Sequence, residues 1–267
     1  MSAPNGRQAP RDATGAARLR GVLDIRGGTG ILVVVTVPFD YDTAPERYRL
    51  GMQAMRAHSA SSLYDRVAVM LTELAARFVL DVGCADGVLR AALPPCGPRL
   101  VGIDASARLL QAHPVPVVQA DAARLPFTDG VFDAVCALNV LYHLTDPLLA
   151  IHEAHRVLRP GGHLIVATIA RDDSPELCKY WTRPATSFDA EDAPGLLARV
   201  FETVTSYPWD APLVTLPDPA AIRDYLIGRQ APVKVANTAS RELPAPLTVT
   251  KRGALILAVK QSPIAAR

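Results

Sequence analysis

The chain has 267 residues, of which 49% are hydrophobic and 20% charged, and this length and composition suit one large α/β domain with or without a cap. Its 28 Lys and Arg against 26 Asp and Glu give a net charge of +2, so no strong field marks it as an obligate nucleic-acid binder. Its four cysteines have no metal-ligand spacing, so we expect reduced thiols and no metal site.

The N-terminal segment, residues 1–36, is rich in Ala, Gly, Arg and Pro, and we expect it to be disordered. Globular character begins near Val37, which suggests the hypothesis that the true start lies there. A glycine-rich stretch at 27–30 imitates a nucleotide loop, but a β-branched run follows it instead of a helix, so we reject it as a cofactor site. The apolar run over 31–37 is too short to span a bilayer, and we expect a cytoplasmic protein.

The remainder, residues 37–267, is predicted to be a single domain in three parts. Apolar residues recur at three- and four-residue spacing between Thr43 and Ala76, which predicts helices. The family resemblance given below implies that 37–77 forms an N-terminal cap. The strand and loop pattern described below makes 78–167 a cofactor-binding core, and 168–267 a divergent half on the substrate side.

A buried strand that stops at a glycine turn is the most informative segment of the core. Residues 78–87 read FVLDVGCADG, and a helix is predicted directly after them, over 88–93. Glycine allows the backbone to turn sharply and to approach a ligand closely, and the N-terminus of the new helix presents unpaired N–H groups to that ligand. The segment therefore predicts a nucleotide site.

Two further strands end on carboxylates. The strand over 100–103 ends on Asp104, which can accept two hydrogen bonds from a ribose diol, and the strand over 115–120 ends on Asp121, which suits an adenine amino group. A fourth strand is predicted over 132–137 and a fifth over 161–167. Because open α/β sheets bind ligands at the carboxyl ends of their strands, we expect these acids along one ligand-binding edge.

The pattern is less regular after the fifth strand. Periodicity and capping residues predict a loop and short helix over 170–181, a helix ending at Val200 and a helix over 217–228. A sixth strand is predicted over 201–209, and Pro- and polar-rich residues 233–246 predict an exposed loop. Residues 247–250 and 253–259 supply the last strand, or a hairpin broken at 251–253.

The runs VLDVGCADG, VGIDAS, QADAARLPFTDGVFDAV, ALNVLYHLTDP and EAHRVLRPGGHLIVA follow one another across residues 78–167. In these runs the chain resembles the class I S-adenosylmethionine-dependent methyltransferases, in particular the small-molecule branch of ubiquinone/menaquinone C-methyltransferase-like (type 11) enzymes. The resemblance implies a Rossmann-like α/β fold: a seven-stranded, mostly parallel sheet with an antiparallel last strand, helices on both faces, and N-terminal helices and a small insertion that cap the site.

The resemblance also implies S-adenosyl-L-methionine as the cofactor. The family usually has glycine where Ala85 stands, and the added methyl group disfavours positive φ, so a tighter loop is expected. A dinucleotide dehydrogenase would need glycine at both Ala85 and Val88. The resemblance implies that the loop around the methionyl part of the cofactor consists of Asp81, Gly83, Cys84, Ala85 and Gly87. It places the ribose at Asp104 with Ala105 and the adenine at Asp121 and Ala122. It places Asn139 beside the methionyl chain.

Methyl transfer from a sulfonium requires an acceptor held in line, and a general base adds to the rate where the acceptor is a hydroxyl or an acidic carbon. His143, after the fourth strand, is the candidate base, although the histidine of this family segment is often structural. Four aromatic residues are candidates for lining the substrate pocket: Tyr41, Tyr48, Tyr142 and Trp181. Ordinary helix packing explains Tyr41 and Tyr48 equally well.

The acceptor is predicted to be a small, fairly apolar molecule methylated at oxygen, nitrogen or carbon. The residues after the fourth strand, 139–142, are not the Asn/Asp-Pro-Pro-Tyr/Phe tetrapeptide of base-amine methylation, and Trp209 and Tyr225 could add apolar walls. An RNA methyltransferase and a non-catalytic S-adenosylmethionine-binding protein remain as alternatives. We expect no membrane or nucleic-acid partner, and a monomer or homodimer.

Overall fold

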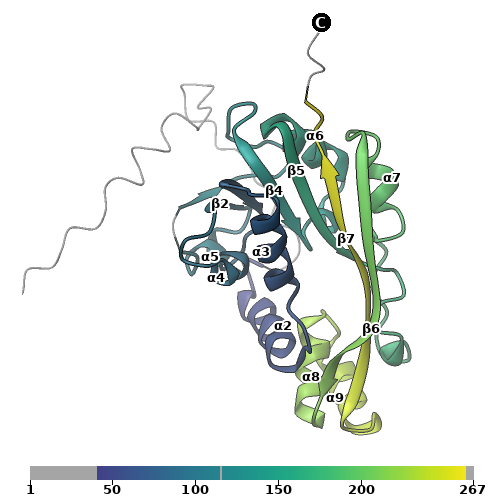
Figure 1. Cartoon of the computed structure of the whole chain (residues 1–267). Coiled ribbons are helices and arrows are strands. Elements are labelled where there is room, and N and C mark those ends of the chain that lie inside the picture. Colours follow the sequence, from purple (N-terminus) through teal and green to yellow (C-terminus); the bar gives the residue numbers. More distant parts are fainter. Residues whose placement is uncertain (1–40, 115, 263–267) are drawn as a thin grey trace, which may run out of the picture.

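The computed structural model describes residues 41–114 and 116–262 (Figure 1). The predicted disorder of residues 1–36, the suggested start near Val37 and the rejected glycine-rich stretch lie outside the described residues. So does Val115, the first residue of the predicted third strand.

The described residues form a seven-stranded sheet in the order β3-β2-β1-β4-β5-β7-β6. β7 is antiparallel to both of its neighbours, β5 and β6, and the other neighbouring pairs are parallel. This confirms the predicted sheet with its antiparallel last strand. The strands are β1 (Phe78–Val82), β2 (Arg99–Asp104), β3 (Val117–Gln119), β4 (Phe132–Leu138), β5 (Leu158–Ile169), β6 (Thr203–Leu216) and β7 (Leu247–Val259).

Helices cover both faces of the sheet, as predicted (Figure 1). On one face α6 (Pro147–Val157) and α7 (Ala193–Leu197) pack apolar side chains on the strands, and on the other α3 (Leu63–Glu73) and α4 (Val88–Ala92) do so. All seven residues of β4 are consequently buried. This explains why the sequence of β4 is apolar except at Asp133 instead of alternating, as is usual for a central parallel strand.

β6 and β7 continue past the end of β5 as a two-stranded ribbon (Figure 1). Three helices pack at this end of the molecule: α2 (Pro45–His58), α8 (Pro219–Gly228) and α9 (Val233–Glu242). Gly51 of α2 and Gly228 of α8 lie so close that the Cβ of an alanine at Gly51 would be 3.1 Å from the Gly228 Cα. The ribbon and these helices form the cap of the cavity described below.

One sequence prediction about this region is wrong. Residues 233–246 are not an exposed loop, because α9 occupies most of the segment and buries Ala236, Ala239 and Ser240. The helix is amphipathic, but its buried side chains are small, so the segment as a whole is not apolar. Of the two alternatives left open for residues 247–259, the continuous strand is confirmed: β7 is unbroken at 251–253, and Lys251 within it is buried against the carboxylate of Asp173.

Smaller differences concern lengths. The helix predicted to end at Val200 is the five-residue α7, and the sixth strand runs on to Leu216. The remaining short helices are α5 (Ala107–Leu110) and the 3-10 helices η1 (Leu141–His143) and η2 (Pro175–Leu177). None of the helices in 41–114 and 116–262 combines the length and apolar character needed to cross a bilayer.

Candidate active site

The loop after β1 has the left-handed backbone that its glycines predict. Gly83 has φ 73°, and a Cβ there would collide with the side chain of Val140. Gly87 has φ 89°, and a Cβ there would meet Pro114 and His113. Ala85 lies between them with φ 46°, so the alanine adopts a conformation that costs an L-residue about 1–2 kcal/mol.

Asp104 connects this loop to the end of β2. Its Oδ2 accepts a hydrogen bond from Ala85 N at 2.9 Å, and its Oδ1 accepts one from Ser106 N at 2.8 Å. Each carboxylate oxygen can accept a second hydrogen bond, so two acceptor positions remain for a ligand. Burial raises the pKa of Asp104, and the two backbone N–H groups oppose that rise.

Three other acceptor groups lie at or just after the ends of β1, β4 and β3. Asp81 is 3% exposed, and burial together with the charge of Asp104 raises its pKa to about 8. Asn139, directly after β4, has φ 56°, and its buried Oδ1 has no hydrogen-bond partner among the described residues. Asp121, after β3, accepts a hydrogen bond from Ala123 N at 2.8 Å.

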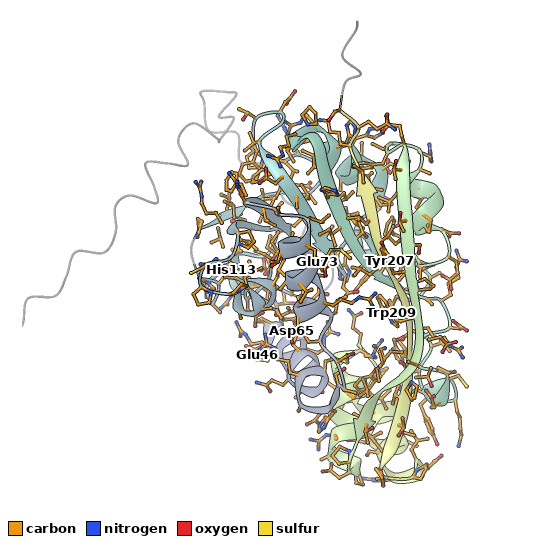
Figure 2. The ribbon with its side chains drawn as sticks, viewed as in Figure 1. Glu46, Asp65, Glu73, His113, Tyr207 and Trp209 are labelled. Carbon is orange, nitrogen blue, oxygen red and sulfur yellow. The ribbon has the colours of Figure 1, made fainter. Side chains whose placement is uncertain are left out.

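One cavity of about 1260 Å³ extends along the C-terminal ends of the parallel strands and beneath the cap. Ligand pockets commonly enclose about 300–1,000 Å³, so this volume has room for a cofactor and a second small molecule. Seven predicted cofactor residues line it: Gly83, Ala85, Asp104, Ala105, Asp121, Ala122 and Asn139. His143 and the four predicted pocket aromatics, Tyr41, Tyr48, Tyr142 and Trp181, also line it, as do Trp209 on β6 (Figure 2) and Tyr225 on α8.

Three of the predicted cofactor residues do not line the cavity. Asp81 lies behind the loop at the end of β1, and Gly87 packs against His113 and Pro114. Cys84 is buried beside Gly102, where its Sγ occupies the space that a Cβ on Gly102 would need. In the structure these residues shape and support the loop, and their contacts with a cofactor stay predictions.

The acidic end of the cavity, Asp104 and Asp121 with Asn139, presents hydrogen-bond acceptors. Carboxylates accept only, and the orphaned Oδ1 of Asn139 lacks a donor. A cationic ligand that carries an ammonium group, ribose hydroxyls and an adenine amino group would supply such donors. The residues present therefore fit S-adenosylmethionine.

Tyr41 and His143 form a polar pair near the middle of the cavity. The Tyr41 hydroxyl and His143 Nε2 are 2.9 Å apart, a hydrogen bond whose donor depends on the histidine tautomer. Burial, and to a lesser extent the charge of Arg183, lower the pKa of His143 to about 4. Burial raises the pKa of Tyr41. Both groups are therefore neutral near pH 7.

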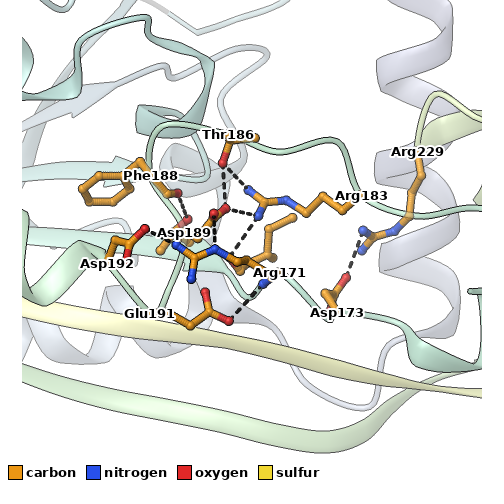
Figure 3. Close-up of polar contacts among 11 residues, drawn as sticks. Arg171, Asp173, Arg183, Thr186, Phe188, Asp189, Glu191, Asp192 and Arg229 are labelled. Atoms are coloured by element: carbon orange, nitrogen blue, oxygen red, sulfur yellow. Dashed lines mark hydrogen bonds and ion pairs between the residues drawn. The ribbon is translucent and has the colours of Figure 1, made fainter.

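Sequence reasoning missed three basic residues that line the substrate side of the cavity: Arg183, Arg229 and Lys251. Arg183 pairs with the buried Asp189, and Arg229 lies 3.0 Å from the carboxylate of Asp173 (Figure 3). In the part of the chain that the structure describes, no three His, Cys, Asp or Glu side chains gather as metal ligands would.

Comparison with known proteins agrees with this geometry. Residues 80–166 match a family described as methyltransferase domain. The ubiquinone biosynthesis O-methyltransferase of Alkalilimnicola ehrlichii is 35% identical over 118 residues, which are 40% of this chain and 48% of that protein. O-methyltransferase cnsE of Penicillium expansum is 35% identical over 134 residues, 44% of this chain and 49% of that protein. The matches thus span about half the length of these relatives.

Among solved structures, an S-adenosylmethionine-dependent methyltransferase of Thermotoga maritima superposes with a TM-score of 0.56. The superposition covers 83% of this chain and 98% of that one at 20% sequence identity, so it shows a shared fold.

Proposed function

We propose that this chain, whose residues 80–166 match a methyltransferase domain and whose fold is shared with an S-adenosylmethionine-dependent methyltransferase, transfers the methyl group of S-adenosylmethionine to a small-molecule acceptor. The observation that carries the proposal is the cavity, whose acidic end fits the cofactor while its volume leaves space for an acceptor beside it. The similarity to two O-methyltransferases supports the small-molecule class.

In this proposal each residue of the acidic end has a binding role. Asp104 holds the ribose diol on the two acceptor positions that its backbone partners leave open. Asp121 receives the adenine amino group, and Asn139 Oδ1 receives a donor from the methionyl part. The bound cofactor supplies an activated methyl group, so the protein needs chiefly to position the acceptor, which can be worth an effective molarity on the order of 10⁵–10⁸ M.

His143 acts through Tyr41 in this proposal. Its Nε2 is already hydrogen-bonded to the Tyr41 hydroxyl, so a proton from a hydroxyl acceptor would pass to Tyr41 as that group gives its own proton to His143. A histidine kept neutral can accept the proton, but the low pKa makes it a weak base. We therefore propose His143 as a positioning residue and modest proton acceptor.

The proposal is tested by calorimetric titration with S-adenosylmethionine and S-adenosylhomocysteine, followed by a screen of small acceptors with methyl-labelled cofactor. Micromolar binding together with label transfer to an acceptor is the expected result. Binding without transfer to any acceptor would favour the non-catalytic alternative, and absence of binding of both ligands would overturn the proposal.

The Tyr41 and His143 pair has its own test, once an acceptor is known. Tyr41→Phe and His143→Gln should each lower kcat where a proton must leave in the transition state, by less than the roughly 10²–10⁴-fold of a base whose pKa matches the operating pH, with little change in cofactor affinity. An equal loss of kcat and of folding stability in both variants would instead indicate a structural pair.

The proposal extends to a cytoplasmic protein without a nucleic-acid partner, as a monomer or homodimer. The comparisons give no support to the RNA alternative. Light scattering after size exclusion measures the oligomeric state, and salt-dependent RNA binding at low micromolar concentration would contradict the small-molecule proposal.

A further inference from the structure

A buried cluster of two bases and one acid lies at the end of the cavity away from Asp104 and Asp121. Asp173 pairs through one carboxylate oxygen with both Lys251 and Arg229, and the Asp173 side chain is fully buried. Its other oxygen accepts a hydrogen bond from the backbone N–H of Arg252 at 2.9 Å. We call Asp173, Arg229 and Lys251 the basic cluster.

The basic cluster holds two basic groups and one acid, and burial together with the charge of Arg229 lowers the pKa of Lys251. Two cations share one carboxylate, and the other polar side chains that face them are the hydroxyls of Ser174, Tyr225 and Tyr142. Burial alone raises the pKa of Tyr225, but Arg229 and Lys251 outweigh it and hold that pKa below its ordinary value. The electrostatic field at this end of the cavity therefore favours a negative group.

The two cations also have donors to offer. Arg229 has five N–H donors, and its partners among the described residues are Asp173 and Tyr225. Lys251 has three, and its partners are Asp173 and Ser174. Both residues line the cavity, and the Arg229 side chain is 16% exposed. A ligand in the cavity can therefore reach unused N–H groups on a planar guanidinium, which suits a carboxylate.

Aromatic side chains surround the cluster. The Arg229 guanidinium lies 5.3 Å from the ring centre of Trp181 and 5.0 Å from that of Tyr225, and these contacts hold it in place. Trp181, Tyr225 and Tyr142 also line the cavity. The ligand chemistry that matches these surroundings is an apolar or aromatic body that ends in a carboxylate.

The sheet order separates this site from the acidic end. Asp121 and Asp104 follow β3 and β2 at one side of the sheet, Asn139 and His143 follow the central β4, and Lys251 lies on β7 at the other side. From these placements we infer that the methyl acceptor is a small carboxylic acid, whose carboxylate binds Arg229 and Lys251 while its nucleophile lies toward Asn139 and Tyr41. The role of this acid as a methyl acceptor rests on the proposed function. The anion-binding site itself is inferred from the geometry of the basic cluster alone.

Calorimetric titration with benzoate and with benzamide tests the inference, because the two probes have nearly the same shape and differ in charge. Each is titrated into the free protein and into protein saturated with S-adenosylhomocysteine. We expect benzoate to bind at least about tenfold more tightly than benzamide to the wild type, as charge-assisted hydrogen bonds to a carboxylate require. Benzoate binding that is no tighter than benzamide binding, or is absent at millimolar concentration, would overturn the inference.

Arg229→Gln should abolish the preference for benzoate, because it removes the guanidinium charge. Asp173 keeps Lys251, Ser174 and the Arg252 N–H as partners, so the fold should be retained. Lys251→Gln is the second variant and leaves Asp173 paired with Arg229. Arg252→Gln is the matched control, since this neighbouring arginine pairs with Asp172 and Asp210 and does not line the cavity.

Loss of the preference in Arg229→Gln and Lys251→Gln, with the preference kept in Arg252→Gln, supports the inference. A preference that survives in both cluster variants overturns it. Binding of S-adenosylhomocysteine distinguishes the two proposals. A benzoate preference without S-adenosylhomocysteine binding would refute the proposed function and leave the anion site, and the reverse result would refute the anion site alone.

Discussion

The contacts at one end of the cavity join residues that are close in the sequence, and those at the other end join residues that are far apart. At the acidic end, Asp104 bonds to Ala85, only 19 positions away, and the glycine loop, the strand ends and the short helices follow one another along the chain. At the other end, Asp173 bonds to Lys251 across 78 positions, with Arg229 between them in sequence. The acidic end is thus a local motif repeated at strand ends, whereas the basic cluster exists only after β7 has paired with β5.

In the two proposals above, the cavity therefore contains two binding sites that differ in charge. The acidic end presents acceptors and suits a cationic cofactor, and the basic cluster presents donors and suits an anionic partner molecule. If this is correct, a substitution at one end should impair binding there and leave the other end intact.

The largest effect is expected for Asp104→Ala. This change removes the ribose acceptors, so affinity for S-adenosylhomocysteine should fall by about 1.5–3 kcal/mol for each charge-assisted bond lost. The preference for benzoate over benzamide should persist, because the basic cluster is untouched. Calorimetry with both ligands measures this, with the exposed Asp210→Ala as a control, and unchanged cofactor affinity would show that the ribose assignment is wrong.

Gly228→Ala tests the contact that joins α8, next to the basic cluster, to α2 over the cavity. A Cβ at Gly228 would overlap the backbone of Gly51, so we expect a loss of about 1–3 kcal/mol in the free energy of unfolding. Gly195→Ala in α7 is the control, because its Cβ meets nothing within 4 Å. Urea denaturation compares the two, and equal stability would argue against close packing of α2 on α8.

Asp81 should make cofactor binding depend on pH. Its folded pKa of about 8 lies above its ordinary value of 3.8, so the free protein holds this proton at pH 7. The stability that the protonated form contributes is complete below the ordinary pKa and is lost as the pH rises through about 8. A cationic cofactor favours the carboxylate, so its affinity should rise by up to about tenfold per pH unit toward pH 8 and then level off.

Calorimetry in buffers of different ionisation enthalpy would detect the released proton. Asp81→Asn should flatten the pH dependence of cofactor binding, while benzoate binding at the basic cluster should be unaffected by this change. A wild-type profile that is already flat between roughly pH 6 and pH 8 would show that cofactor binding does not change the protonation of Asp81, which contradicts this prediction.

Ala85→Gly should have the smallest effect. Glycine relieves the positive φ of 46°, worth about 1–2 kcal/mol, but it loses a buried methyl group, worth about 0.8 kcal/mol, and gains freedom in the unfolded chain. These contributions nearly cancel, so the free energy of unfolding should change by less than about 1 kcal/mol. Urea denaturation checks this, and a larger gain in stability would show that the alanine strains the loop.

Much of the acidic end could be predicted from the sequence. The residues that end β2 and β3 were identifiable because strands, glycine turns and helix starts each have a local pattern. The lining role of Asp104, Asp121 and Asn139 agrees with that reading, although their contacts with a cofactor stay predictions. Cys84 and Gly87 were placed in the same motif, but the pattern does not tell which side chains of a loop face inward.

The cap could not be predicted in the same way. The helix α9 is amphipathic, but its buried face consists of the small side chains of Ala236, Ala239 and Ser240, in a segment read as a loop from its Pro and polar residues. A hairpin broken at 251–253 was left open as an alternative to a continuous last strand, and β7 is continuous. Lys251 lies within this strand and pairs with Asp173, and the sequence does not indicate that pairing.

The sequence by itself determined the core strands and the order of acids along the strand ends, because these follow from local periodicity and from the geometry of parallel strands. The seven-stranded sheet with its antiparallel last strand was implied by the family resemblance. Only the tertiary structure decided that Arg229, Lys251 and Asp173 meet, that Tyr41 reaches His143, and that α2 packs on α8. Each of these contacts joins segments far apart in the chain, and their free energy comes from burial and charge pairing that no single segment carries alone.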